Sequence, residues 1–254
     1  MAIGSKLAGK VALITGAGQG VGQGIAFALA AEGVAVVVTG RTLAKVQVTA
    51  DEISKRGGKA LAIACNVKDA ASMEAAVART VAELGGLQIL VNNAQEVPLG
   101  PLLAVSEEAL AAGWESGPLA AFRLMKLCHP HLKGDGCIIN LATPAAKRWD
   151  LSGYGAYAAV KEAMRQLTRA AACEWARDGI RCNDILPLAN SPAMAWWTRE
   201  RPAEAAAFIA SVPMQRVGDC EADIGRFVVS LCSEDCRYIN GQSIAVDGGQ
   251  AFLG

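Results

Sequence analysis

The sequence predicts an α/β fold, a doubly wound parallel sheet of about seven strands flanked by helices. Short, fully apolar runs alternate with longer helix-like segments along the chain. A strand that is apolar at every position is typical of a sheet buried on both faces, and alternation with helices favours parallel βαβ connections. No Pro- or Ser-rich linker or repeat interrupts the pattern, so we expect residues 1–254 to form a single domain.

The elements follow in order from the N-terminus, and each strand is a run rich in Val, Ile, Leu, Ala or Cys. After the first strand, Ile25 and Leu29 mark the apolar face of a helix that stops at Gly33. Val160 and Met164 begin an apolar stripe that would anchor a later, longer helix by packing. The expected strands are 11–14, 34–38, 61–65, 87–91, 137–141, 180–186 and 243–246. The expected helices lie near 20–32, 42–56, 69–84, 106–132, 154–178 and 219–231.

The charge of the chain is balanced, with 24 Lys and Arg against 24 Asp and Glu. Because no basic block or arm occurs, we expect neither nucleic acid nor a membrane surface as a partner. The first apolar run is too short for a signal-peptide core or a membrane span, so a cytoplasmic protein is expected. The eight cysteines contain no C-x-x-C pair, which favours reduced, structural thiols and no metal site.

A glycine-rich segment, TGAGQGVG at 15–22, lies between the first strand and the first helix. Missing side chains at such a turn let backbone N–H groups approach a pyrophosphate, and the helix N-terminus adds partial positive charge. The segment therefore predicts a dinucleotide site. Its G-x-x-x-G-x-G spacing differs from the commoner fingerprint, and an ordinary tight βα turn is the alternative.

Tyr157 and Lys161 are four residues apart, so they would project from the same face of one helix. A nearby ammonium favours phenolate over phenol, so we expect the pKa of Tyr157 to be lowered toward neutrality. Such a phenol can exchange a proton with a carbonyl or alcohol oxygen. An exposed helical pair without a catalytic role is the alternative.

With these motifs in place, the chain resembles the short-chain dehydrogenase/reductase family over nearly its whole length. The matching elements are the glycine segment, Asn92-Asn93-Ala94, Tyr157 with Lys161, and NGQSIAVDGG at 240–249. The resemblance implies a Rossmann-like single domain, a nicotinamide cofactor and a homotetramer or homodimer.

The resemblance also assigns roles to single residues. Tyr157 is expected to be the general acid/base, and Lys161 to bind the nicotinamide ribose and lower the pKa of the tyrosine. Thr143 takes the place of the family's serine, and its hydroxyl can still hold the substrate oxygen. Alternatively, Thr143 merely ends a strand before Pro144. The expected cofactor-binding residues are Gly16, Gln19, Gly20, Val21, Gly22, Arg41, Thr42, Asn66, Val67, Asn93, Ala94, Tyr157, Lys161 and Pro187.

The sequence departs from the family pattern at three places near this site. Gln95 replaces a glycine, and Leu188 replaces the glycine that usually follows Pro187. Gly117, followed by Pro118, stands where the family has an asparagine that supports a helix kink and a water relay. A proline also bends a helix, so we hypothesise that Gly117–Pro118 reaches the same bend by another route.

The end of the second strand bears on the choice of cofactor. An acidic residue there would hydrogen-bond the adenosine ribose, but this chain has no acid and an immediate Arg41. Because a guanidinium suits a phosphate, NADP(H) is favoured over NAD(H). A solvated arginine at the start of the next helix is the alternative reading.

The substrate is expected to meet the segment after the sixth strand. Aromatic and thioether side chains there suggest an apolar, bulky or cyclic carbonyl or alcohol, although they could instead cover a subunit contact. The residues are Leu188, Met194, Trp196 and Trp197, with Trp149 and Tyr154 ahead of Tyr157. We therefore predict an oxidoreductase that interconverts a ketone and a secondary alcohol. A nucleotide-binding scaffold or sensor with a degraded site is the alternative, motivated by the departures at Gln95, Gly117 and Leu188.

Overall fold

The computed structural model describes residues 7–148 and 151–251 and contains one parallel sheet with the strand order β3-β2-β1-β4-β5-β6-β7. All seven predicted strands are present, with ends shifted by a few residues, which confirms the predicted doubly wound fold. Their bounds are β1 Val11–Thr15, β2 Ala35–Gly40, β3 Ala60–Ala64, β4 Ile89–Asn92, β5 Gly136–Leu141, β6 Ile180–Pro187 and β7 Ser243–Val246.

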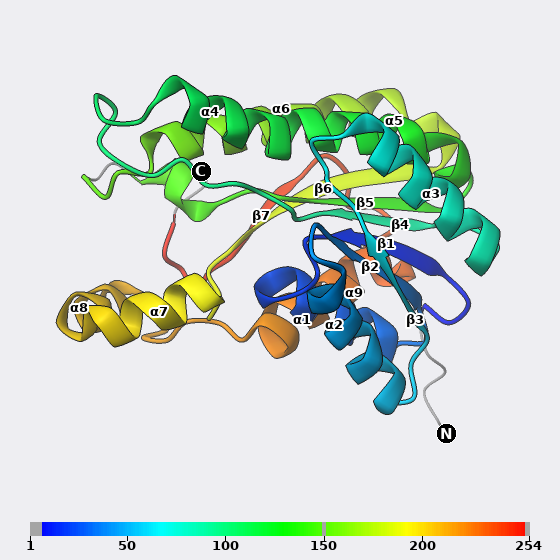
Figure 1. Ribbon diagram of the computed structural model, residues 1–254, viewed down its shortest axis with the longest axis horizontal. Helices are drawn as coiled ribbons and strands as arrows, with labels where there is room; N and C mark the ends of the chain where they lie inside the picture. The colour runs from blue at the N-terminus through cyan, green and yellow to red at the C-terminus, as the bar shows by residue number, and fades with distance from the viewer. Residues whose placement is uncertain (1–6, 149–150, 252–254) are drawn as a thin grey trace.

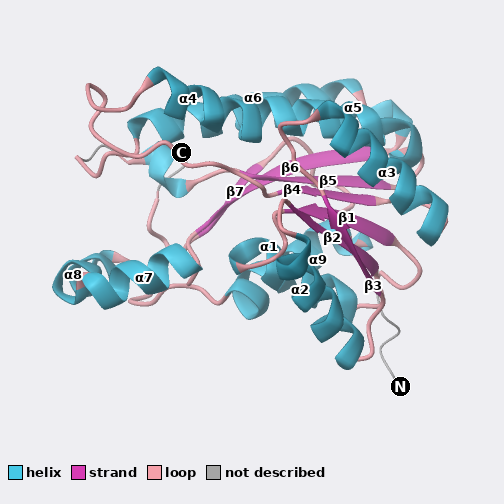
Figure 2. Cartoon of the chain, in the orientation of Figure 1, coloured by secondary structure: helices cyan, strands magenta, loops and turns pink. Residues whose placement is uncertain are grey.

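Helices cover both faces of the sheet (Figures 1 and 2). One face carries α1 Gly20–Ala31, α2 Leu43–Lys55 and α9 Arg226–Cys232. The other carries α3 Ala70–Leu84, α4 Glu107–Trp114, α5 Ala120–Leu132 and α6 Gly155–Glu174. Each layer has its own apolar core, because alternate residues of β1, such as Ile14 and Leu13, point to opposite faces.

The predicted helix near 106–132 is present without a break, but its hydrogen-bonding pattern changes in its middle. Residues Glu115–Leu119 form a π-helical turn with Pro118 inside it, between α4 and α5. A π-turn tolerates a proline, which has no N–H to donate within the helix, and it is a common cause of helix distortion. Gly117 and Pro118 thus lie in one widened turn of the helix, and the hypothesis that they bend it as the family's asparagine does stays a prediction.

Two helices follow β6 where only a loop was expected, α7 Pro192–Glu200 and α8 Pro202–Ser211. They extend away from the sheet (Figure 1). The start signals were present, because Ser191 caps α7 by accepting a hydrogen bond from Met194 N at 3.3 Å, and a proline begins each helix. These start signals could have predicted both helices from the sequence.

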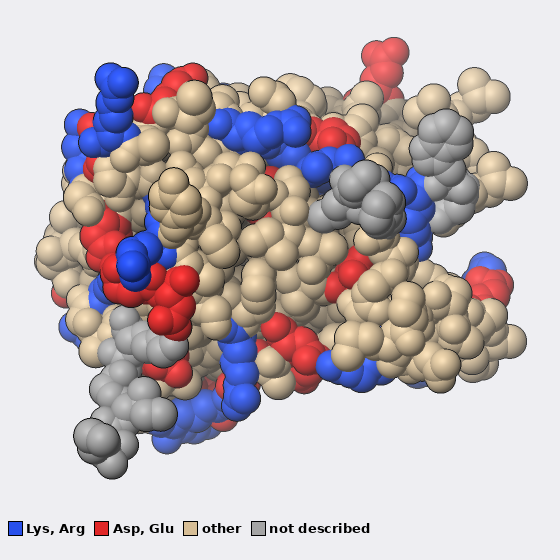
Figure 3. Space-filling view, turned by 180° about the vertical axis from the view of Figure 1, so that it is seen from behind, with Lys and Arg blue, Asp and Glu red and all other residues tan. Residues whose placement is uncertain are grey.

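The remaining short elements are 3₁₀ turns at Pro144–Lys147, Ala176–Asp178 and Glu234–Cys236, and a second π-turn at Cys220–Gly225 ahead of α9. No helix within 7–148 and 151–251 combines the length and the apolar character needed to cross a membrane. On the face seen in Figure 3, Lys and Arg are interspersed with Asp and Glu, and the α7–α8 region presents mostly uncharged side chains.

Candidate active site

A cleft of about 450 Å³ lies at the carboxyl ends of β1, β2 and β4, where the strand order reverses. In a doubly wound sheet this switch point is where dinucleotides bind. Most of the predicted cofactor residues meet there although they come from separate parts of the chain. Those that line the cleft are Gly16, Gln19, Gly20, Val21, Arg41, Thr42, Asn66, Val67, Asn93 and Ala94.

The glycine turn is held against the end of β4 by Asn93. Its side-chain Nδ2 donates to Thr15 O at 2.8 Å and to Gly16 O at 3.1 Å. Gly16 has a φ of +65°, which favours glycine, and a Cβ added at Gly22 would lie 2.5 Å from Asn93 Nδ2. Gly22 does not line the cleft, so in this structure its visible role is to let the turn pack closely on β4.

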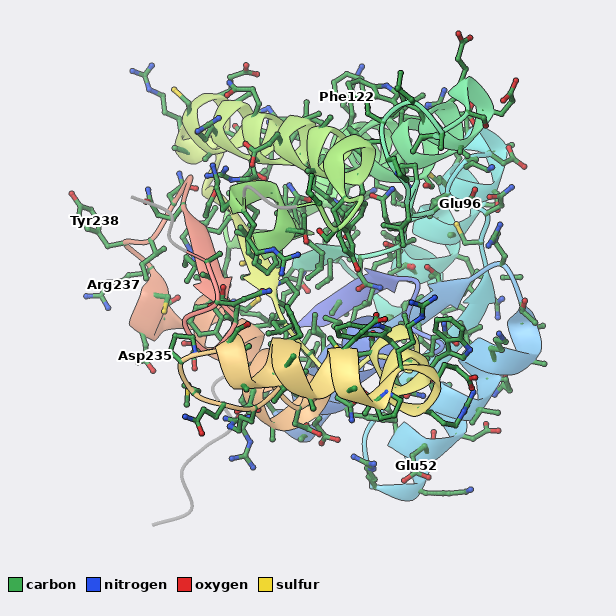
Figure 4. The ribbon with its side chains drawn as sticks, turned by 90° about the vertical axis from the view of Figure 1, so that its left-hand side faces the viewer. Glu52, Glu96, Phe122, Asp235, Arg237 and Tyr238 are labelled. Atoms are coloured by element: carbon green, nitrogen blue, oxygen red, sulfur yellow. The ribbon has the colours of Figure 1, made fainter. Side chains whose placement is uncertain are left out.

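Four charged side chains surround the end of the cleft next to β2 and β3. Arg41 and Lys68 both pair with Glu96, with N–O distances of 3.0 Å and 3.3 Å, and Lys45 lines the same space. Figure 4 shows Glu96 on the same side of the molecule as Glu52 of α2. The sequence had singled out only Arg41. Lys45 lies four residues farther along, a spacing that could have revealed it.

The predicted catalytic residues lie together beside β5. Tyr157 and Lys161 are on α6, and the side chain of Thr143, just after β5, hydrogen-bonds Tyr157. The Thr143 hydroxyl also accepts from Ala145 N at 3.3 Å, so it caps the following 3₁₀ turn. Thr143 thus follows the strand and also contacts the phenol, and its role at a substrate oxygen stays a prediction.

The ammonium of Lys161 is buried and turns toward the sheet. Its Nζ donates to Leu141 O at 2.6 Å, and it lies 5.7 Å from the centroid of the Tyr157 ring. Burial lowers the pKa of Lys161 from 10.5 to about 7, because the interior disfavours the charged form. The main-chain carbonyl gives the ammonium a partner without a counter-charge.

The predicted lowering of the Tyr157 pKa is wrong for this structure. Burial raises the pKa of Tyr157 to about 12, and the hydrogen bond with Thr143 opposes that shift only in part. The surroundings of the half-buried Tyr157 disfavour its phenolate form. The Lys161 ammonium, which was expected to favour phenolate, is only partly charged near neutral pH. At neutral pH the phenol is therefore protonated and can act as a proton donor.

A chain of buried amides and hydroxyls joins α6 to the middle of the sheet. Asn92 Nδ2 donates to Asn140 Oδ1, and Asn140 Nδ2 donates to Thr168 Oγ1, both at 2.8 Å. Because these groups are buried, they fix the register of α6 against β5. Asn140 was missed, although a polar residue inside the apolar run 137–141 could have indicated it.

An aromatic cluster begins beside Tyr157. The rings of Tyr154 and Tyr157 are 6.1 Å apart, and the Arg148 guanidinium lies 5.9 Å from the Tyr154 centroid and 5.6 Å from that of Phe208 on α8. Trp197 contacts Phe208 edge to face, whereas Trp196 is 55% exposed. The predicted Trp149 lies outside the described residues. Pro187 ends β6 and does not line the cleft.

Comparisons with known proteins identify the class. A family model described as enoyl-(acyl carrier protein) reductase matches residues 16–251. The chain is 38% identical to a 12alpha-hydroxysteroid dehydrogenase of a Clostridium species, over 95% of this chain and 96% of that protein. It is 35% identical to a cyclohexanol dehydrogenase of an Acinetobacter species, over 96% of both chains. A solved short-chain dehydrogenase of Burkholderia cenocepacia in complex with NADP has a TM-score of 0.88 and 30% identity, and the match covers 96% of this chain and 99% of that one.

These relatives define an oxidoreductase of the alcohol/ketone type. The chain belongs to the short-chain dehydrogenase/reductase family. It is a short-chain alcohol dehydrogenase/ketoreductase, and its relatives are dehydrogenases, which weighs against a nucleotide-binding scaffold.

Lys161→Met tests the buried ammonium. Because the folded pKa of about 7 lies below the ordinary 10.5, the unfolded chain holds the extra proton between these values, and stability rises with pH in that window. We expect the free energy of unfolding of the wild type, relative to Lys161→Met, to rise by about 1–4 kcal/mol from pH 7 to pH 10. Urea unfolding at both pH values measures this. Lys55→Met, at an exposed lysine of α2, should keep the wild-type pH dependence, and an identical slope in Lys161→Met would contradict the account.

Proposed function

We propose that this protein interconverts a ketone and a secondary alcohol with NADP(H), and that Tyr157 exchanges the proton. The observation that carries the proposal is the contact of the Tyr157 phenol with Thr143 beside Lys161, although none of these three residues lines the dinucleotide cleft itself. A hydroxyl and a phenol that touch one another can hold one substrate oxygen between them.

Tyr157, Thr143 and Lys161 have separate roles in this proposal. The nicotinamide, when bound, supplies or accepts the hydride. In reduction, the protonated Tyr157 donates to the developing alkoxide, and Thr143 hydrogen-bonds the same oxygen. Lys161 lies close enough for its charge to favour phenolate in the reverse direction, and its pKa of about 7 means that this charge is present only in part at neutral pH.

The cleft fits a dinucleotide, because its glycine turn has no side chains where a pyrophosphate would approach and side chains at Gly16 or Gly22 would collide with Asn93. The preference for NADP(H) is supported by three cations, Arg41, Lys45 and Lys68, against the single carboxylate of Glu96. A 2′-phosphate would compete with Glu96 for Arg41 and Lys68. A related dehydrogenase of known structure binds NADP.

An apolar, cyclic substrate is supported by the ring of Tyr154 beside Tyr157, by the Trp197–Phe208 pair that Arg148 connects to Tyr154, and by relatives named for a steroid and for cyclohexanol. Self-association, as a homodimer or homotetramer, is supported by the α4–α5 face. There Leu110, Trp114 and Phe122 are 42%, 47% and 43% exposed, and Phe122 lies on the outer surface of its layer (Figure 4).

Tyr157→Phe removes the proton donor while it keeps the ring. We expect kcat for a cyclic ketone such as cyclohexanone to fall by about 10³-fold or more, with the Kd of NADPH within about threefold of wild type. Steady-state rates and fluorescence titration of NADPH measure the two quantities. Tyr238→Phe, at a fully exposed tyrosine, is the matched control and should retain turnover. Undiminished turnover by Tyr157→Phe would refute the assignment.

Arg41→Ala tests the cofactor preference. Loss of the guanidinium should raise the Kd of NADPH by about tenfold or more, because a charge-assisted contact to the 2′-phosphate disappears, and should change the Kd of NADH by less than about threefold. Arg199→Ala, on the exposed side of α7, serves as the control. An equal change for both cofactors would show that Arg41 does not distinguish them.

A further inference from the structure

Gln95 joins the end of β4 to the π-turn Glu115–Leu119. Gln95 lines the cleft together with Asn93 and Ala94, and its amide turns toward Gly113 at the end of α4. Its Nε2 donates to Gly113 O at 2.8 Å and to Glu96 O at 2.7 Å. One side chain therefore links the strand end that bounds the cleft to the irregular turn between α4 and α5.

The Gln95 amide is bonded at the junction of α4 and the π-turn. Gly113 lies in the last turn of α4, and Pro118, inside the π-turn, has no N–H to donate within the helix. Gly113 O accepts from Gln95 Nε2 at 2.8 Å and, at the longer distance of 3.4 Å, from Ser116 Oγ. A second cross-link lies beside it, because Glu96 N donates to Ser116 Oγ at 2.8 Å and Ser116 Oγ donates to Ala112 O at 2.7 Å.

Gly117 gives Gln95 its space. A Cβ added at Gly117 would lie 2.3 Å from Gln95 Oε1 and 3.1 Å from its Cδ. The φ of Gly117 is not in the left-handed range, so the backbone itself would accept a side chain. A side chain at position 117 would therefore displace the neighbouring amide, so the two departures from the family pattern fit one another.

The amide is not there for packing alone. Its Oε1 is buried and has no hydrogen-bond partner among the described residues, which is a cost that an apolar side chain of the same length would avoid. The hydrogen bonds of Nε2 account for its presence. The turn that they hold packs directly against α6, the helix that carries Tyr157 and Lys161 (Figure 1).

We propose that Gln95 is a positioning residue for the proton-transfer site and that Gly117 is its partner. The Gln95 amide fixes the π-turn, and the π-turn packs against α6, so the phenol of Tyr157 is held beside Thr143. The effect on turnover rests on the proposed function, whereas the structural link between Gln95 and Gly117 does not.

Gln95→Met keeps the length of the side chain and removes the amide. We expect kcat to fall by about tenfold, with KM and the Kd of NADPH within about threefold, because the donor to Gly113 O is lost while a side chain of the same length still occupies position 95 in the wall of the cleft. Gln166→Met, at an exposed glutamine of α6, should match the wild type. Wild-type kcat in folded Gln95→Met would overturn the positioning role.

A double-mutant cycle tests the pairing. Gly117→Ala should lower kcat by about tenfold in the wild-type background, because its Cβ displaces the Gln95 amide, but by less than about twofold in Gln95→Gly, where that amide is absent. Amide hydrogen exchange of residues 113–119 should show the same coupling and needs no substrate. An equal effect of Gly117→Ala in both backgrounds, by either readout, would overturn the pairing. Coupled exchange in a protein without turnover would instead refute the proposed function and leave the pairing intact.

Discussion

The site depends on one buried constraint, the seating of the Lys161 ammonium against the carbonyl of Leu141 at 2.6 Å. This hydrogen bond ties the catalytic face of α6 to the carboxyl end of β5. The buried Asn92–Asn140–Thr168 chain ties the same helix to β4 and β5 deeper in the sheet. Because the helix cannot slide along the sheet without breaking these bonds, the phenol of Tyr157 stays next to Thr143.

The same constraint explains the ionisation of the pair. Lys161 is buried at the carboxyl end of β5 with a neutral carbonyl as its partner, so it loses part of its charge. Tyr157, on the same helix, keeps its proton. The Gln95–Gly117 contact acts on the π-turn that packs against α6, so the helix is held both by the sheet and by the π-turn.

Much of this could be predicted from the sequence. Apolar strands and the turn at 15–22 indicated the fold and most of the cleft, because burial on both faces and missing side chains leave direct marks on the sequence. The partnership of Gln95 with Gly117, and that of Glu96 with Arg41 and Lys68, could not be read in advance. These contacts join residues far apart in the chain. The direction of the Tyr157 shift was missed because spacing on a helix reveals proximity but not burial.

A crystal structure with NADP(H) and a cyclic ketone or alcohol tests the central claim most directly. The account predicts that Tyr157 Oη and Thr143 Oγ1 both lie within about 2.6–3.2 Å of the substrate oxygen, with the nicotinamide beside them and the adenosine phosphate near Arg41. A substrate oxygen bound by other groups, or a nicotinamide that lies away from Tyr157, would contradict it.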